Sequence, residues 1–164
     1  MKSTGIVRRL DDLGRLVIPK EIRKQYRLKE GDSIEFYIDQ DRIIIQKYDL
    51  LSRHVEEIKI MCETLTSMFE NTVLFMQDEM LAAHGKTIAE GFAKKCKVHR
   101  VTHFEQQAVY ENDSALYNGV LYPVVAYGDW YGAFVVLYDK RELSEPELAA
   151  VEAFAKVLTR QQEQ

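Results

Sequence analysis

The stretch GIVRRLDDLGRLVIPKEIRKQYRLKEGD, residues 5–32, decides how the first part of this chain folds. Its apolar residues fall in two short runs, which predict strands over residues 4–10 and 15–19. The sequence DDLG separates the runs, and Gly14 suits a loop residue that must reach a positive φ. We therefore expect two strands joined by a tight loop.

A short helix is expected next, over residues 19–28. Pro19 ends the second strand and suits a first helical turn, where its missing N–H costs nothing. Ile22 and Tyr26 stand one turn apart and are expected on the inner face. Gly31 is expected to stop the helix.

Two further strands follow. DSIEFYIDQ, residues 32–40, alternates Ile34, Phe36 and Ile38 as a strand with one inner face does. RIIIQKY, residues 42–48, follows the polar turn DQDR. A unit of about 50 residues is marginal as a monomer, so a dimer that shares one core is expected. Two-fold symmetry would duplicate every arginine, which suits a pseudo-palindromic DNA site.

The charge of the chain is unevenly distributed. The net formal charge is −4, yet residues 1–48 hold 11 Lys and Arg against 8 Asp and Glu, while residues 49–164 hold 11 against 18. Within residues 1–29 alone, nine basic residues stand against three acidic ones. This asymmetry favours a polyanionic partner for the first part of the chain, with chance surface charge as the alternative.

The overall composition indicates an ordinary globular protein. The 164 residues are 46% hydrophobic and 29% charged, which argues against extensive disorder. No stretch approaches the roughly 18 apolar residues of a membrane span, and the N-terminus lacks a signal-peptide core. Cys62 and Cys96 are too few for a disulfide framework. We expect a cytoplasmic protein without a membrane partner.

Residues 1–48, MKSTGIVRRLDDLGRLVIPKEIRKQYRLKEGDSIEFYIDQDRIIIQKY, resemble the AbrB-type DNA-binding domain of bacterial transition-state regulators. The whole chain resembles those members of the AbrB/SpoVT family that add a ligand-sensor-like domain. The resemblance implies a swapped-hairpin β-barrel dimer, interlocked between subunits. It also implies a nucleoid-associated transcription regulator that binds double-stranded DNA and controls sporulation genes.

The resemblance also implies the DNA-binding residues. The family's DNA-contacting arginines fall on this sequence at Arg8, Arg15, Arg23 and Lys24. Lys24 departs from the family, and lysine lacks the planar fork that pairs bidentately with guanine, so a phosphate contact is expected there. Lys2 and Arg9 are added by proximity alone. Few polar base readers accompany these cations, which favours recognition of groove shape.

Several of these residues have a structural alternative. Arg23 and Arg27 could solvate a helix face without touching a ligand. Asp11 and Asp12 are expected to cap the loop by Asx turns or to pair with Arg8 or Arg9.

Residues 49–71 are expected to form a connecting amphipathic helix. Its apolar positions step by 4, 3, 4, 3 and 4 residues: Leu51, Val55, Ile58, Cys62, Leu65 and Phe69. Such a seam serves either self-association or packing within one subunit. Either way, the thiol of Cys62 is expected to act as a small buried hydrophobe.

A second amphipathic helix is expected over residues 144–162. Ser144 and Glu147 have the spacing of a capping box, and Leu143 and Leu148 that of a hydrophobic staple. Two helices that bracket a domain often pack together, and across a symmetry axis they could build a bundle. The resemblance implies such a tetramer of two dimers.

Residues 72–164 predict an α+β domain with an antiparallel sheet flanked by helices. The expected elements are a strand over 71–77, a helix over 86–96, an extended region over 99–112, and strands over 119–127 and 130–138. Gly128 and Asp129 form the expected hairpin turn, and Pro123 predicts a sheet edge or a bulge. YPVVAYGDWYGAFVVLY, residues 122–138, resembles the late hairpin of GAF domains, which commonly sense small molecules.

No enzyme is expected in this half. Cys96, His99 and His103 have metal-like spacings, but zinc sites need three or four ligands and only His84 is nearby in sequence. No acid or oxyanion donor accompanies a Cys–His pair. We expect no cofactor and no metal. The possible small-molecule ligand has no assigned residues. Five aromatic residues could line a cavity or belong to the core: Tyr117, Tyr122, Tyr127, Trp130 and Tyr131.

Two other functions remain open. An antitoxin could use the same N-terminal domain to repress its own operon, although antitoxin tails tend to be disordered until bound. A metabolite-binding module, or an enzyme, could carry an incidental basic face.

Overall fold

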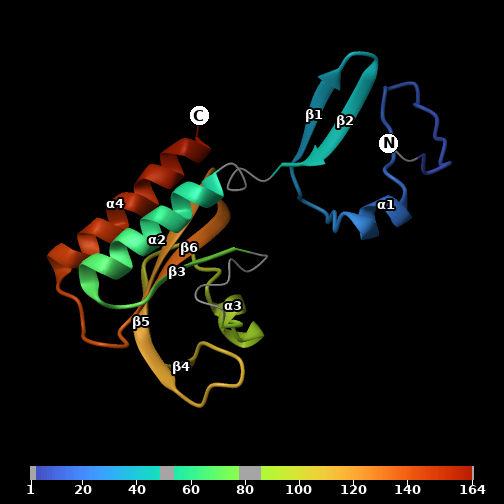
Figure 1. Ribbon diagram of the computed structural model, residues 1–164. Coiled ribbons are helices and arrows are strands. Elements are labelled where there is room, and N and C mark those ends of the chain that lie inside the picture. The colour runs from blue at the N-terminus through green and yellow to red at the C-terminus, as the bar shows by residue number, and fades with distance from the viewer. Residues whose placement is uncertain (1–2, 49–53, 78–85, 164) are drawn as a thin grey trace. The chain divides into compact units, whose positions relative to one another are not determined.

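The computed structural model describes residues 3–48, 54–77 and 86–163 of the chain. The chain divides into two compact units, Met1–Asp49 and Leu50–Gln164 (Figure 1). We refer to them as the first and the second unit.

The described residues of the first unit form one short helix and one hairpin. Helix α1 spans Lys20–Gln25, and strands β1, Ile34–Asp39, and β2, Arg42–Lys47, pair antiparallel across a two-residue turn. The helix and both strands confirm the prediction. The helix is shorter than expected because Arg27 adopts a left-handed φ of 51°, which ends it well before Gly31.

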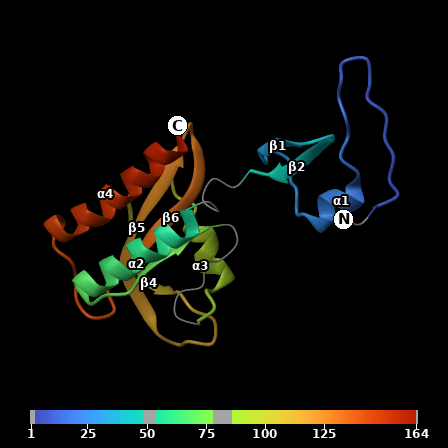
Figure 2. The ribbon, with the colours of Figure 1, turned by 45° about the horizontal axis from the view of Figure 1, so that its top comes forward.

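The strands predicted over residues 4–10 and 15–19 do not form within the single chain, so this prediction is wrong for the isolated subunit. The segment instead runs as an open loop (Figure 2), whose tip is closed by backbone hydrogen bonds. Asp11 N–H donates to the Arg15 carbonyl at 3.2 Å, and Gly14 N–H to the Asp11 carbonyl at 3.1 Å. Gly14 has the positive φ expected of it, 73°. A strand requires a neighbour to share its ladder, and within the described chain these residues have none.

None of the described residues of the first unit is fully buried. Tyr26, expected on an inner face, is 62% exposed, and only Ile22 of that pair is half-buried. Seven other apolar side chains are at least 66% exposed: Val7, Leu10, Leu13, Val17, Phe36, Ile38 and Ile43. One copy of this unit therefore has no core of its own.

The second unit is built on a four-stranded antiparallel sheet with the order β3-β6-β5-β4. The strands are β3 Val73–Met76, β4 Thr102–Ala108, β5 Leu116–Ala126 and β6 Asp129–Leu137. Helices α2, Val55–Phe69, and α4, Glu145–Gln162, lie side by side over one face of the sheet, and α3, Glu90–Lys95, lies at the other (Figure 1). The α+β prediction is confirmed.

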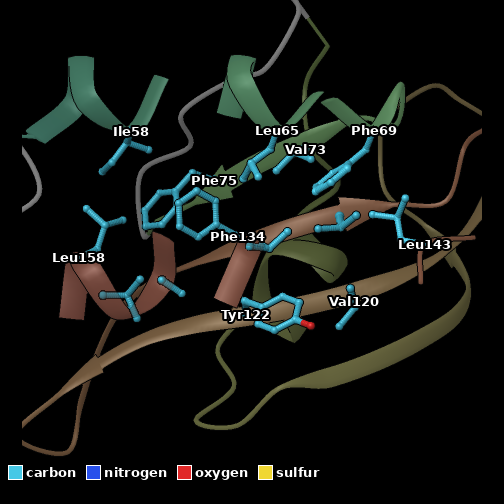
Figure 3. Close-up of a cluster of buried hydrophobic side chains, with 14 residues drawn as sticks. Ile58, Leu65, Phe69, Val73, Phe75, Val120, Tyr122, Phe134, Leu143 and Leu158 are labelled. Carbon is cyan, nitrogen blue, oxygen red and sulfur yellow. The ribbon is translucent and has the colours of Figure 1, made fainter. Parts of the chain in front are cut away.

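Side chains of alternate strand residues build one core on each face of the sheet. The first core joins α2 and α4 to the sheet (Figure 3) and contains Ile58, Leu65, Phe69, Val73, Phe75, Val120, Tyr122, Phe134, Val151 and Leu158 among others. The second lies beneath α3 and contains Leu74, Met76, Ile88, Phe92, Cys96, Leu121, Val135 and Leu137 among others.

The amphipathic seam of α2 packs within its own subunit. Ile58, Leu65 and Phe69 are each at most 2% exposed in the first core, while Cys62 is half-buried against it. Self-association through these residues is therefore wrong, because the sheet already covers them. Leu51, the first residue of the seam, lies outside the described residues.

The β5–β6 hairpin turn lies one residue earlier than predicted. Ala126 pairs with Asp129, so Tyr127 and Gly128 form the turn, both with positive φ. The pairing register shifts at a bulge, because Val124 pairs with Gly132 but Val125 pairs with Trp130. The bulge leaves one residue of β6 unpaired, and this displaces the turn by one position. Just before the bulge, Pro123 pairs with β6 but lies beyond the pairing of β4 with β5, which confirms its edge-like position.

Helix α4 begins with the predicted capping box. The Ser144 N–H donates to Oε2 of Glu147 at 2.9 Å, and Leu143 is buried beside it. Helix α3 is shorter than the predicted 86–96, because Ile88 bridges to Tyr110 instead of entering the helix.

Candidate nucleic-acid interface

Those predicted DNA-contacting side chains that the structure describes lie on the surface of the first unit. The exposed residues are Arg8, Arg9, Arg15, Arg23 and Lys24. Lys2 lies outside the described residues. The loop of residues 3–19 carries three of these cations, and α1 carries Arg23 and Lys24 in its last turn.

Arg15 is held by Asp11 across the tip of the loop. Its Nε lies 2.6 Å from Oδ2 of Asp11, while Oδ1 accepts the backbone N–H groups of Arg15 at 2.8 Å and of Leu13 at 3.0 Å. These hydrogen bonds, above all that of the Arg15 backbone, lower the pKa of Asp11. One carboxylate thus closes the turn and orients the guanidinium through its Nε.

Two other arginines are anchored by backbone carbonyls. Nη1 of Arg8 donates to the carbonyl of Val7 at 3.0 Å, and Nη1 of Arg23 donates to the carbonyl of Ile18 at 3.1 Å. A guanidinium has five N–H donors, so such a bond uses a small part of its capacity. The second bond also ties α1 to the end of the loop, which relates Arg23 to the loop arginines.

The carboxylate of Asp32, two residues before the hairpin, is paired with groups other than the loop arginines. Asp32 accepts the backbone N–H of Lys29 at 2.7 Å and lies 3.4 Å from Nζ of Lys47, and both groups lower its pKa. The Asp32 carboxylate therefore interacts with Lys47 on β2 and does not neutralise the arginines of the loop.

The sequence predicted the turn-capping role of Asp11 but not its ion-pair partner. An Asx turn was expected at the loop and is confirmed, but the partner of Asp11 is Arg15, not Arg8 or Arg9. The four-residue spacing of Asp11 and Arg15 across the glycine turn was the available signal.

Among the residues that the structure describes, the second unit has no cluster of side chains that could bind a metal ion. There is no group of three or more His, Cys, Asp and Glu side chains placed to hold an ion, and His84 lies outside the described residues. Cys96 is buried, and burial raises the pKa of its thiol to about 12, so it is a core residue.

The aromatic residues of the β5–β6 hairpin belong mainly to the cores. Tyr122 is buried, and Tyr117 and Tyr131 pack partly buried against the two core clusters. Tyr127 is exposed at the turn, and Nζ of Lys97 lies 5.7 Å from the ring centre of Trp130. The core alternative is therefore confirmed for the three tyrosines other than Tyr127.

Comparison with known proteins decides the family. Stage V sporulation protein T of Bacillus subtilis is 36% identical over 178 aligned positions, which cover 100% of both chains. The chain belongs to the AbrB/SpoVT family. The transition state regulatory protein AbrB of the same organism is 54% identical over 48 residues, 29% of this chain and 50% of AbrB. The putative transition state regulator Abh is 52% identical over 48 residues, 29% of this chain and 52% of its own.

Two further matches concern the first unit of this AbrB/SpoVT protein. A family model described as antidote-toxin recognition MazE, bacterial antitoxin, matches residues 7–50. The solution structure of the N-domain of the transcription factor abrB is 54% identical and covers 29% of this chain and 92% of that one, with a TM-score of 0.28. Among the described residues, no helix is long and apolar enough to cross a membrane.

Proposed function

We propose that this protein is a DNA-binding transcription regulator that controls sporulation genes, with the first unit as the DNA-binding dimer and the second as an assembly and regulatory domain. The observation that carries the proposal is the 54% identity to a transition state regulatory protein, because it falls on the unit that presents the arginines. The full-length similarity to a sporulation protein supports the role in sporulation. Such a regulator acts at the nucleoid in the cytoplasm.

The first unit acts as a dimer. No residue between positions 3 and 48 is fully buried in one copy, which leaves Phe36, Ile38 and Ile43 at 67%, 86% and 73% exposed. Burying such side chains is worth about 1.5–3 kcal/mol each, which a second copy supplies by sharing the core. The apolar runs around residues 4–10 and 15–19 then find the strand neighbours that one chain lacks, as in a swapped hairpin.

DNA binding rests on the exposed cations. Arg8, Arg15 and Arg23 contact the duplex, and Lys24 contacts phosphate, with Arg9 and Lys2 as weaker contributors. Phosphate contacts supply most of the affinity through counterion release, and duplication by the dimer doubles them. The arginines lie on a loop and a short helix with few amide side chains beside them, which supports recognition weighted toward groove shape.

The second unit assembles dimers into a tetramer through α2 and α4. Beyond their sheet-facing residues, these helices keep Ile60 and Met68 of α2 and Val157 of α4 at 61%, 60% and 44% exposed. A ligand of this GAF-like unit would act by binding one arrangement of the tetramer more tightly than another.

The test is DNA affinity of the full chain at several salt concentrations, measured by fluorescence anisotropy on a labelled duplex. Arg15→Ala is expected to weaken binding and to reduce the slope of log affinity against log salt by about 2, because the dimer loses two phosphate contacts, one from each subunit. Arg8→Ala and Arg23→Ala should weaken it too. The control is Arg160→Ala, an exposed arginine at the end of α4. A slope near zero for the wild type, or equal affinity of the Arg15 and Arg160 variants, would refute the proposal.

A second candidate is an antitoxin, because residues 7–50 match the MazE antitoxin model. That match covers the first unit only. The second unit has two buried cores, unlike tails that stay disordered until bound. Co-purification of a small partner protein with the chain from its own host would favour this candidate.

A further inference from the structure

A cluster of cations stands out on the acidic second unit. The sequence KKCKVHRVTH, residues 94–103, runs from the end of α3 to the start of β4 and contains four Lys and Arg with no Asp or Glu. Beside it lies a cavity of about 420 Å³ between α3 and β4. A cavity of this size suits a small organic ligand.

The floor of this cavity is apolar and built to fit. Phe92, Phe104 and Leu121 line it, and the two phenylalanine rings meet edge to face with their centres 5.2 Å apart. A Cβ atom at Gly119 would lie 2.6 Å from the Phe104 ring and 2.1 Å from the Val136 carbonyl. Only glycine at position 119 lets Phe104 lie where it does, so the wall depends on a specific residue choice.

The charge at the rim is held in place without being neutralised. Nε2 of Gln107 donates to the carbonyl of Glu105 at 2.9 Å, which turns Oε1 of Gln107 toward Nζ of Lys95, with which it forms a hydrogen bond. A neutral amide orients an ammonium group and leaves its charge uncompensated. Its neighbour Lys94, by contrast, is paired with the carboxylate of Glu90 at 2.9 Å.

The backbone at this rim is strained. The β4–β5 pairing shifts register between Phe104 and Gln107, and Gln106 there has a left-handed φ of 49°. Asn118 holds it, because its Oδ1 accepts the Gln106 backbone N–H at 2.8 Å. A left-handed conformation is strained for a residue other than glycine, and such strain concentrates at ligand sites. Gln107, which accepts the hydrogen bond from Lys95, is the first residue paired again after this bulge.

We propose that this cavity binds a small organic anion, with a carboxylate, phosphate or sulfonate group on Lys95 and a flat apolar body against Phe92 and Phe104. Thr102 and His103 line the same rim and offer further polar contacts. All lining residues belong to the second unit, so the inference deepens the regulatory role proposed for that unit and can be tested without DNA.

The test uses two fluorescent dyes on the full-length protein. 8-Anilinonaphthalene-1-sulfonate carries an anionic group on a flat apolar body, and N-phenyl-1-naphthylamine has the same body without the charge. The wild type is expected to bind the anionic dye at least tenfold more tightly than the neutral one. Lys95→Gln should remove that preference, and the matched control Lys94→Gln should keep it within twofold.

Two further variants keep the test decisive should Lys95→Gln not fold. Gln107→Glu is nearly isosteric and places a carboxylate beside Lys95. It should therefore lower the affinity for the anionic dye about tenfold and leave the affinity for the neutral dye unchanged. Glu105→Gln removes from the rim a negative charge that repels the sulfonate, so it should strengthen binding of the anionic dye. Equal affinities in the Lys94 and Lys95 variants, no effect of Gln107→Glu, or weaker anion binding after Glu105→Gln would each overturn the proposal.

Discussion

At the scale of single residues, Asp11 shows how one side chain serves folding and function together. Its two carboxylate oxygens accept three N–H groups, two from the backbone of the loop tip and one from the Arg15 side chain. The same carboxylate therefore shapes the turn and restricts the rotamers of an arginine that contacts DNA in our proposal. A negative charge that would repel phosphate is retained because it orients a positive one.

Asp11→Asn tests this orienting role. Asparagine keeps an oxygen for the backbone N–H groups of the turn but loses the charged bond to the Arg15 guanidinium. We expect DNA affinity to fall several-fold, even though the net charge becomes less negative. Asp12→Asn makes the same charge change at an exposed neighbour and should strengthen DNA binding at low salt, since only repulsion is removed. The affinities of both variants are measured by titrating them into one labelled duplex. Tighter binding by Asp11→Asn than by the wild type would contradict the proposal that Asp11 orients Arg15.

A second residue-scale prediction concerns Glu147 at the start of α4. Two bonds from the Arg141 guanidinium, and then the backbone N–H of Ser144, lower its pKa from 4.5 to about 2. Because the folded pKa lies below the unfolded one, the stabilisation is complete above about pH 4.5 and is lost as pH falls toward 2. The unfolding temperature of Glu147→Gln should thus lie below that of the wild type at pH 6, and the gap should close by about pH 2.

The matched control is Glu145→Gln, which changes another acid in the first turn of α4. Both variants lose a similar interaction with the helix dipole, so the difference between them isolates the pair with Arg141. A gap for Glu147→Gln that stays constant from pH 6 to pH 2 would contradict the assigned pKa.

At the scale of elements, the spacing of apolar residues predicted most strands and helices. It did not predict where an element ends when a bulge or a tertiary contact sets that end. The alternation in residues 32–40 was strong enough to give β1, and the apolar runs in residues 42–48 and 119–138 gave β2, β5 and β6. The turn at Tyr127 was misplaced by one residue because a bulge leaves no mark in the apolar pattern. Likewise, the cavity beside β4 depends on a bulge and on one glycine contact, neither of which has a sequence motif.

Gly119→Ala tests that glycine contact. Its Cβ would clash with the Val136 carbonyl of the neighbouring strand, and backbone cannot move aside cheaply within a sheet. We expect the free energy of unfolding to fall by more than about 2 kcal/mol. Gly91→Ala, in α3 with open space around its Cβ position, should instead raise it by up to about 1 kcal/mol. Chemical denaturation of both variants compares them, and equal stabilities would show that the sheet absorbs the added methyl group.

At the scale of the whole molecule, the two units differ in whether one copy of the chain forms a hydrophobic core. The second unit has two buried cores, whereas among the described residues of the first unit no side chain is fully buried. Apolar pattern alone could not predict which strands form in one chain, because residues 4–10 and 15–19 have strand-like sequences without a neighbour in the same subunit. In our proposal the second copy supplies that neighbour, so the DNA-binding unit folds fully only on assembly.

Two charged substitutions separate the two proposed interfaces. Ile43→Asp, on β2, should abolish association of the first unit and with it DNA binding, because an aspartate cannot be buried unpaired in a shared core. Met68→Glu, on the exposed side of α2, should halve the mass from tetramer to dimer and leave a dimer of first units that still binds DNA. Light scattering gives the mass and anisotropy the affinity, while circular dichroism checks that the second unit stays folded. Leu116→Asp, at an exposed β5 position outside both surfaces, is the control and should change neither the mass nor the affinity. If Ile43→Asp kept full DNA affinity, the shared core could not be what positions the arginines.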